Sequence, residues 1–338
     1  MLVMRPAQMA DLSEVQRLAA DSPVGVTSLP DDADCLRDKI AASEASFSAE
    51  VSFNGEESYF FVLEDTEAGR LVGCSAIVAS AGYSDPFYSF RNETFVHASR
   101  SLSIHNKIHA LSLCHDLTGN SLLTSFYIEP GLVRSVASEL NSRGRLLFVG
   151  SHPERFAEAM VVEIVGQSDE HGDSPFWDAV GRNFFDMSYT TAERLSSLKS
   201  RTFLAELMPH YPIYVPLLPD AAQEAMGQVH PRAQITFDIL MREGFETEHY
   251  IDIFDGGPTL HARTSGIRSI AQSRVVPIRI GEPEQGGRSY LLANGQLQDY
   301  RAVVAELDWV PGKPLTLSAQ VAEALGVGEG ASVRLVAV

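Results

Sequence analysis

His230, followed by Pro231, is the residue of this sequence that is best placed for chemistry. Proline has no backbone N–H to lose, so it fits the first position of a helix and leaves His230 as the cap-side residue. Apolar residues recur at helical spacing as far as Leu240, and Gly244 suits a left-handed end to the helix. The sequence therefore predicts a histidine at a helix N-terminus.

The chemistry that such a histidine offers is proton transfer or hydrogen-bond donation. Imidazole has the side-chain pKa closest to neutrality, so His230 is the best single candidate for a catalytic residue. The helix dipole disfavours an imidazolium at this position, which favours a base or a neutral N–H donor over a charged acid. The alternative is that His230 only caps or packs the helix start.

A metal site is not indicated by the other histidines and the cysteines. His105, His109 and His115 lie four and six residues apart, but no HExxH motif accompanies them. The three cysteines are far apart and form no CxxC pair, so neither a zinc site nor a disulfide framework is predicted. We therefore expect no bound metal.

The charge of the chain limits its partners. The 338 residues carry a formal net charge of −18, and an acidic surface repels nucleic acid and anionic membranes but is compatible with a small cationic substrate. No apolar run reaches about 18 residues, and the N-terminal residues lack a signal-peptide pattern. The cytoplasm is the expected location, and no membrane span is expected.

The elements that must position His230 follow an α+β order. Strands are predicted near residues 2–5, 59–63, 71–78, 122–128, 159–165 and 247–254. Helices are predicted near residues 12–19, 31–45, 132–149, 190–207 and 219–226. An extended segment is predicted at 183–189 and a polar, loop-rich segment at 82–120. After residue 258 the pattern becomes mostly β, with one short helix at 318–325 and a closing strand at 333–338. We predict a first domain at 1–258 and a β-rich C-terminal subdomain at 259–338.

A set of motifs in one order carries a resemblance to a known family. They lie at residues 27–30, 85–86, 96–99, 174–177, 205–209, 212–214, 227–231, 243–245 and 250–260. Over essentially its full length the chain resembles the arginine N-succinyltransferase family, within the N-acetyltransferase superfamily of acyl-CoA enzymes. It resembles most the alpha subunit of the two-subunit form.

The resemblance implies both a fold and an activity. The fold is a mixed, mainly antiparallel sheet flanked by helices. The activity is transfer of the succinyl group of succinyl-CoA to the α-amino group of L-arginine in arginine catabolism, giving N2-succinylarginine and CoA; L-ornithine is left open as a second acceptor. The resemblance also implies a proton donor at His230, a succinyl-CoA contact at Phe126, no permanently bound cofactor, and a related beta subunit as partner in a hetero-oligomer.

One stretch departs from the superfamily pattern. In the superfamily, a glycine-rich turn lets backbone N–H groups approach a pyrophosphate. In this chain Val136 and Ser138 occupy the positions of the superfamily's glycines, and Glu139 adds a negative charge. Arg134 can still contact a phosphate through its guanidinium. Whether this chain binds CoA without its partner is left open. The alternative function is a non-catalytic or regulatory subunit that stabilises an active beta subunit.

The sequence also offers candidates for the rest of the pocket, without ranking them. A guanidinium needs a carboxylate, and the acids in or beside predicted strands are Glu129, Glu163, Asp252 and Asp255. Candidates for the lining of an acyl pocket are the aromatic residues Phe126, Tyr127, Phe176 and Trp177. The alternative is that they belong to the core.

Overall fold

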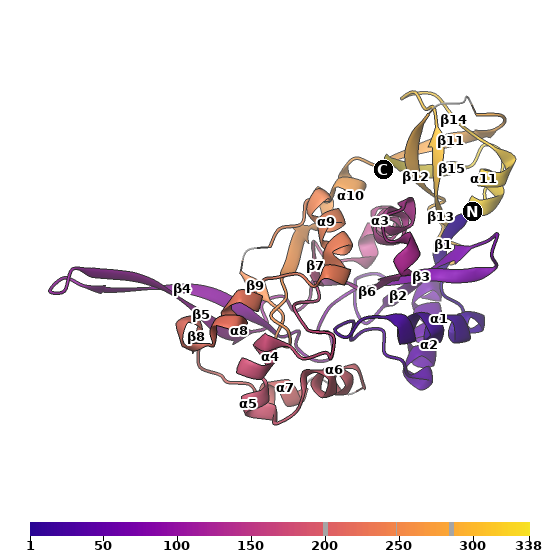
Figure 1. Ribbon diagram of the computed structural model, residues 1–338. Coiled ribbons are helices and arrows are strands. Elements are labelled where there is room, and N and C mark those ends of the chain that lie inside the picture. Colours follow the sequence, from indigo (N-terminus) through magenta and orange to yellow (C-terminus); the bar gives the residue numbers. More distant parts are fainter. Residues whose placement is uncertain (199–201, 248, 284–286) are drawn as a thin grey trace.

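A large mixed sheet forms the centre of the molecule (Figure 1). The computed structural model describes residues 1–198, 202–247, 249–283 and 287–338. Within these residues, the eleven strands of the sheet are β1 (Leu2–Pro6), β2 (Ser58–Asp65), β3 (Arg70–Val78), β6 (Ser121–Ile128), β7 (Ala159–Glu163), β10 (Thr259–Arg263), β11 (Arg274–Ile280), β12 (Arg288–Ala293), β13 (Ala302–Leu307), β14 (Leu315–Leu317) and β15 (Ser332–Ala337). Their order across the sheet is β10-β7-β6-β3-β2-β1-β13-β12-β15-β11-β14.

The strands of this sheet are mainly antiparallel, as predicted. Among the described strands, only β6 with β7 and β11 with β14 run parallel. The β6–β7 pairing is short, because it joins only Ser121 to Met160 and Leu122 to Val161. Beyond these two pairs the strands are no longer held together by a ladder.

Helices cover both faces of the sheet. Those of the described residues are α1 (Leu12–Asp21), α2 (Ala33–Ser48), α3 (Val136–Ser151), α4 (Pro175–Ala179), α5 (Arg182–Phe185), α6 (Tyr189–Leu198), α7 (Thr202–Leu207), α8 (Asp220–Ala225), α9 (Gln234–Arg242), α10 (Arg268–Ala271) and α11 (Ala319–Leu325). Successive side chains of a strand point to opposite faces, so Phe60 and Val62 pack with α1 and α2, whereas Phe61 and Leu63 pack with α3.

A second, four-stranded sheet contains the largest departure from the prediction. Its order is β8 (Ile213–Tyr214), β5 (Ile104–Cys114), β4 (Ser89–Ser99) and β9 (Tyr250–Ile251). The prediction that the segment 82–120 is loop-rich is wrong, because β4 and β5 form a long hairpin there. The hairpin projects from the body of the molecule (Figure 1). Most side chains of its outer half are exposed, so the apolar alternation that marks a half-buried strand is missing there.

Two further local predictions need correction. The predicted extended segment 183–189 contains α5 and the first residue of α6. The predicted strand 247–254 shrinks to the two residues of β9, because the side chain of Asp252 accepts hydrogen bonds from the backbone N–H groups of Phe254 and Asp255 and folds the chain into a turn. Residue 248 of that strand and residues 199–201 of the predicted helix 190–207 lie outside the described residues.

The C-terminal strands and α11 enclose an apolar core of their own. This part joins the central sheet where β13 pairs with β1, through Met4 and Ala302. The first strand after residue 258 is β10, which pairs with β7 at the far edge of the sheet. The domain division at residue 258 stays a prediction. None of the helices in the described part of the chain has the length and apolarity to cross a bilayer.

Candidate active site

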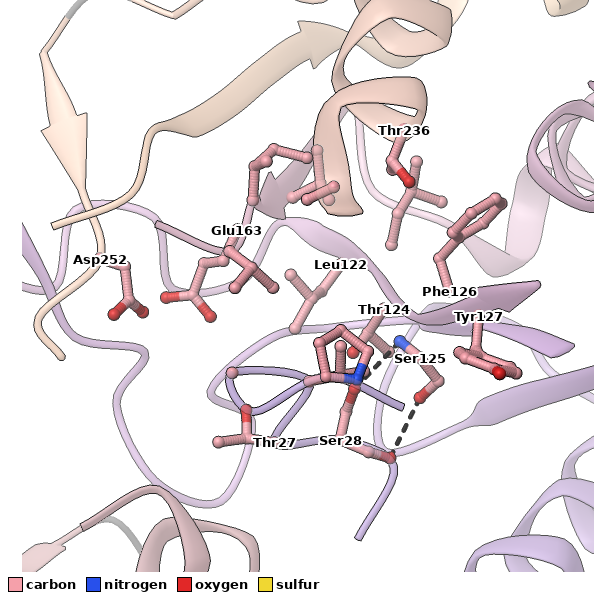
Figure 2. Close-up of a pocket in the computed structure, with 18 of the residues that line it drawn as sticks. Thr27, Ser28, Leu122, Thr124, Ser125, Phe126, Tyr127, Glu163, Thr236 and Asp252 are labelled. Carbon is pink, nitrogen blue, oxygen red and sulfur yellow. Dashed lines mark hydrogen bonds between the residues drawn. The ribbon is translucent and has the colours of Figure 1, made fainter. Parts of the chain in front are cut away.

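A cavity of about 680 Å³ lies where β6 and β7 diverge. Its wall is made by β6, β7, the loop 25–28, the segment 81–87, the turn 130–134 that precedes α3, and the start of α9. Figure 2 shows side chains of these segments converging on one space. Segments that are far apart in the sequence therefore form a single binding site.

A bulge in β6 shapes the middle of this cavity. Tyr127 is opposite Cys74 and Thr124 is opposite Ala76, so the chain of β6 has one extra residue between these pairs. Ser125 lies in the bulge with φ +53°, a left-handed conformation that non-glycine residues seldom adopt. Such strain persists only where the surroundings hold the backbone in place.

Hydrogen bonds from two sides hold the bulge. The backbone N–H of Ser125 donates to Ser28 Oγ at 3.0 Å, and Ser125 Oγ donates to the Ser28 carbonyl at 3.1 Å (Figure 2). From the other face of the sheet, Asn141 Nδ2 of α3 donates to the carbonyls of Cys74 and Tyr127, both at 2.9 Å. The loop 25–28 and helix α3 together fix the strand that lines the cavity.

Replacing Ser28 with alanine is expected to destabilise the protein by about 1–3 kcal/mol, because the backbone N–H of the buried Ser125 loses its acceptor. Urea denaturation measures this change in the free energy of unfolding. Ser48→Ala is the matched control, since that exposed hydroxyl donates only within α2 and its loss should cost less than about 0.5 kcal/mol. Equal effects of the two variants would contradict this account of the bulge.

Carboxylates gather in the wall of the cavity. Among the described residues, those that line it are Glu163, Glu193, Asp252 and Asp255, together with Asp85 on the segment 81–87. Figure 2 shows Glu163 and Asp252 pointing toward one another, away from Phe126. We call Glu163, Glu193, Asp252 and Asp255 the acidic end. Glu129, the remaining predicted acid, pairs instead with Arg17 and Arg70.

Asp255 is the most deeply held of these acids. Its carboxylate accepts from the N–H groups of Gly166 (2.7 Å) and Gly257 (2.8 Å) and from the Tyr189 hydroxyl (3.2 Å). Burial, and then the neighbouring charge of Asp252, raise the pKa of Asp255 well above its usual range. The charge of Asp252 disfavours ionisation of Asp255, and a cation bound at the acidic end would relieve this repulsion.

His230 caps the short 3₁₀ turn η5 (Pro231–Ala233) that leads into α9, as predicted. Its Nδ1 accepts from the backbone N–H of Arg232 at 3.2 Å, so the neutral ring carries its proton on Nε2. Burial and the Arg232 charge lower the pKa of His230. The ring is partly exposed, and its neighbours Pro231 and Arg232 line the cavity whereas the ring itself does not.

The other predicted contacts divide between cavity and core. Phe126 and Tyr127 line the cavity from β6, whereas Phe176 and Trp177 are fully buried in a separate core cluster. Arg134 is exposed and lines the cavity from the turn before α3. The negative charge of Glu139 is compensated within the protein, because this carboxylate pairs with Arg143 (3.1 Å) and Arg242 (2.7 Å).

Sequence reasoning assigned no role in the site to five charged residues that line the cavity, Lys39, Asp85, Arg145, Glu193 and Arg232. The signal for Arg145 was a cation directly before the apolar run 146–149 of the predicted helix 132–149. Lys39 and Glu193 carry no such signal, because charged residues on helices usually face solvent. The structure places no group of three or more His, Cys, Asp or Glu side chains that could hold a metal ion within the described residues.

Comparison with known proteins gives consistent matches along the chain. The family model described as arginine N-succinyltransferase beta subunit matches residues 2–269, and that of its C-terminal domain matches residues 274–337. Arginine N-succinyltransferase subunit alpha from Pseudomonas aeruginosa PAO1 is 83% identical, over 100% of both chains. Arginine N-succinyltransferase from Escherichia coli 55989 is 38% identical, over 99% of this chain and 97% of its own.

A solved structure agrees with these matches. The structure of arginine/ornithine succinyltransferase subunit AI from P. aeruginosa superposes with a TM-score of 0.93 at 80% identity, covering 100% of this chain and 98% of its own. Family models and relatives both span almost the whole chain. The chain therefore belongs to the arginine N-succinyltransferase family.

Proposed function

We propose that this chain transfers the succinyl group of succinyl-CoA to the α-amino group of L-arginine, giving N2-succinylarginine and CoA. The observation that carries the proposal is the cavity itself, whose acidic end lies beside the bulged strand β6. Carboxylates suit the guanidinium and amino groups of arginine, and the bulged strand suits the thioester. The names of the relatives, arginine N-succinyltransferases, support the same assignment.

The reaction is a direct acyl transfer. The neutral α-amine attacks the thioester carbonyl carbon, the new C–N bond forms, the C–S bond breaks, and the amine loses a proton as the thiolate leaves. Charge on the thioester oxygen is stabilised by backbone N–H groups, and a bulge frees such groups from the strand ladder. Because the N–H of Ser125 itself is held by Ser28, we assign this role to the β6 backbone that follows the bulge residue, with Phe126 as the acyl-CoA contact.

His230 is assigned to the leaving sulfur. With Nδ1 engaged by the Arg232 N–H, the neutral ring directs Nε2–H at the leaving sulfur as a hydrogen-bond donor and keeps its proton. The proton that the amine loses passes to the thiolate and gives CoA. Of the two roles that the sequence leaves open, the local geometry favours the donor. Arg134, exposed at the rim before α3, is assigned to the CoA phosphates.

The direct test is an assay of the purified chain with succinyl-CoA and L-arginine, alone and with its related beta subunit. CoA release with a product mass equal to succinylarginine is the expected result. No turnover of succinyl-CoA in either preparation, with acetyl-CoA accepted in its place or not, would refute the proposal. The same assay with L-ornithine measures the preference between the two acceptors.

We also propose that a related beta subunit binds the β4–β5 hairpin. The relatives are named as subunits, and the projecting hairpin exposes the large apolar side chains Phe95, Val96, Leu102 and Ile104. Exposed apolar groups gathered on one element mark protein–protein contacts.

The double variant Val96→Asp, Leu102→Asp is therefore expected to lose co-purification with the beta subunit, because binding would bury two unpaired charges. Co-expression followed by size-exclusion chromatography measures the complex. Val310→Asp is the control, since this side chain is also exposed but lies outside the hairpin. Loss of the complex in both variants, or in neither, would contradict the assignment.

A further inference from the structure

Arg145 of α3 brings a buried cation to the cavity. Its side chain is fully buried; Nη1 donates to the carbonyls of Ala76 and Thr124, both at 3.1 Å, and Nε donates to the Ser142 carbonyl at 3.1 Å. Its Nη2 is buried and has no hydrogen-bond partner among the residues that the structure describes. The guanidinium lies 5.7 Å from the ring centroid of Phe126, so one donor group remains available beside the acyl-CoA contact.

Lys39 of α2 brings a second cation from the other face of the sheet. It lines the same cavity, and its Nζ lies 5.2 Å from the ring centroid of Phe60. Although α2 and α3 cover opposite faces, Lys39 and Arg145 both act electrostatically on the Cys74 thiol, so their charges share one region of the molecule. We call these two residues the cationic end of the cavity.

The positive charge at this end is not balanced by the protein. Among the described residues, no carboxylate lies within 4 Å of either cation. Burial lowers the pKa of Arg145 to about 9 and that of Lys39 to about 8, so both still carry charge at neutral pH. A buried cation with a spare donor is costly unless an anion joins it.

We propose that Arg145 and Lys39 form the subsite for the terminal carboxylate of the acyl group, and that they select succinyl-CoA over uncharged acyl-CoA. The inference rests on the proposed function and adds the residues that decide the acyl specificity. Placed there, the carboxylate accepts from Arg145 Nη2 and neutralises Lys39, while the acidic end holds the cationic acceptor. The two charged ends of one cavity then match the two substrates.

Butyryl-CoA is the matched probe, because a methyl group replaces the carboxylate on the same four-carbon chain. The test measures kcat/KM for succinyl-CoA and for butyryl-CoA with L-arginine, in the complete complex. Lys39→Met should lower the succinyl-to-butyryl ratio by about 10- to 100-fold, as expected for losing a charge-assisted contact. Lys313→Met, an exposed lysine outside the cavity, should leave the ratio unchanged.

Arg145→Gln should change the ratio in the same direction. Arg145 also donates hydrogen bonds to two strand carbonyls, so its replacement can destabilise the fold. The ratio for Arg145→Gln therefore counts only if the melting temperature of this variant matches that of the wild type. If it does not, the test rests on Lys39→Met. An equal loss with both thioesters, or an unchanged ratio in Lys39→Met, overturns the subsite. Failure of the proposed function is a different result, since the wild type would then not turn over succinyl-CoA with arginine.

Discussion

Replacing His230 with alanine is expected to lower kcat by about 100- to 1,000-fold in the two-subunit complex, the usual range for loss of a hydrogen-bond donor to charge that develops in the transition state. The reason is the geometry of the ring, because Nδ1 is occupied by the Arg232 N–H and only Nε2–H can serve the leaving thiolate. Steady-state turnover of succinyl-CoA with saturating arginine measures the effect. KM for both substrates should change little, since the donor acts on charge that develops during the reaction.

His230→Asn separates catalysis from capping. Asparagine is a preferred cap residue, so this variant retains an acceptor for the Arg232 N–H, whereas alanine loses it and should cost about 1 kcal/mol. If the cap were the whole role of His230, the asparagine variant would keep near-wild-type turnover. A fall in kcat in both variants, with the stability loss confined to alanine, is the expected pattern.

The lowered pKa of His230 gives this comparison a pH dependence. A group whose pKa is depressed by folding is preferentially neutral in the native state, so its contribution to stability is complete above its unfolded pKa of about 6.5 and is lost as the pH falls. Asparagine does not titrate, so the wild type should lose stability relative to His230→Asn as the pH falls below about 6.5. Urea denaturation at a series of pH values measures it.

Replacing Glu163 with glutamine is expected to raise KM for arginine by about 10- to 100-fold, the loss that follows from weakening a charged hydrogen bond. Glu163 lies in the acidic end, facing Asp252 (Figure 2), and glutamine keeps its shape while removing its charge. KM for succinyl-CoA should stay within about twofold, because the thioester is assigned to the strand on the other side.

Glu129→Gln is the matched control for this variant. Glu129 is also a strand-end carboxylate, but it pairs with Arg17 and Arg70 outside the cavity wall. Its neutralisation should leave KM for arginine unchanged. A parallel rise in KM for both substrates in Glu163→Gln, or an equal rise for arginine in Glu129→Gln, would remove Glu163 from the acceptor site.

Parts of this site were readable from local patterns because local physics produces them. A proline after a histidine predicts a capped helix start, and His230 caps η5. The predicted left-handed end of the helix is found at Gly244, where φ is +93°. Glycine adopts this conformation readily because it has no Cβ. Two apolar runs at 59–63 and 71–78, with Gly69 in the turn between them, predicted the hairpin at the centre of the sheet.

Other parts depended on contacts between distant segments. The β4–β5 hairpin escaped prediction because its outer half has no buried face to impose a pattern. The bulge at Ser125 has no glycine to announce its φ of +53°; the conformation is held by Ser28, 97 residues away in the chain. Of four predicted acids, only the tertiary structure separated Glu129 from the three that reach the cavity.

The sequence by itself determined the order of elements outside the β4–β5 hairpin and the segments 183–189 and 247–254, together with the capped histidine, the family resemblance and the candidate residues on β6 and β7. Only the tertiary structure decided which charges share one cavity and at which end each lies. The physical reason is that propensity, capping and periodicity act between neighbours in the chain. Lys39 and Arg145, by contrast, line one cavity although their helices cover opposite faces of the sheet.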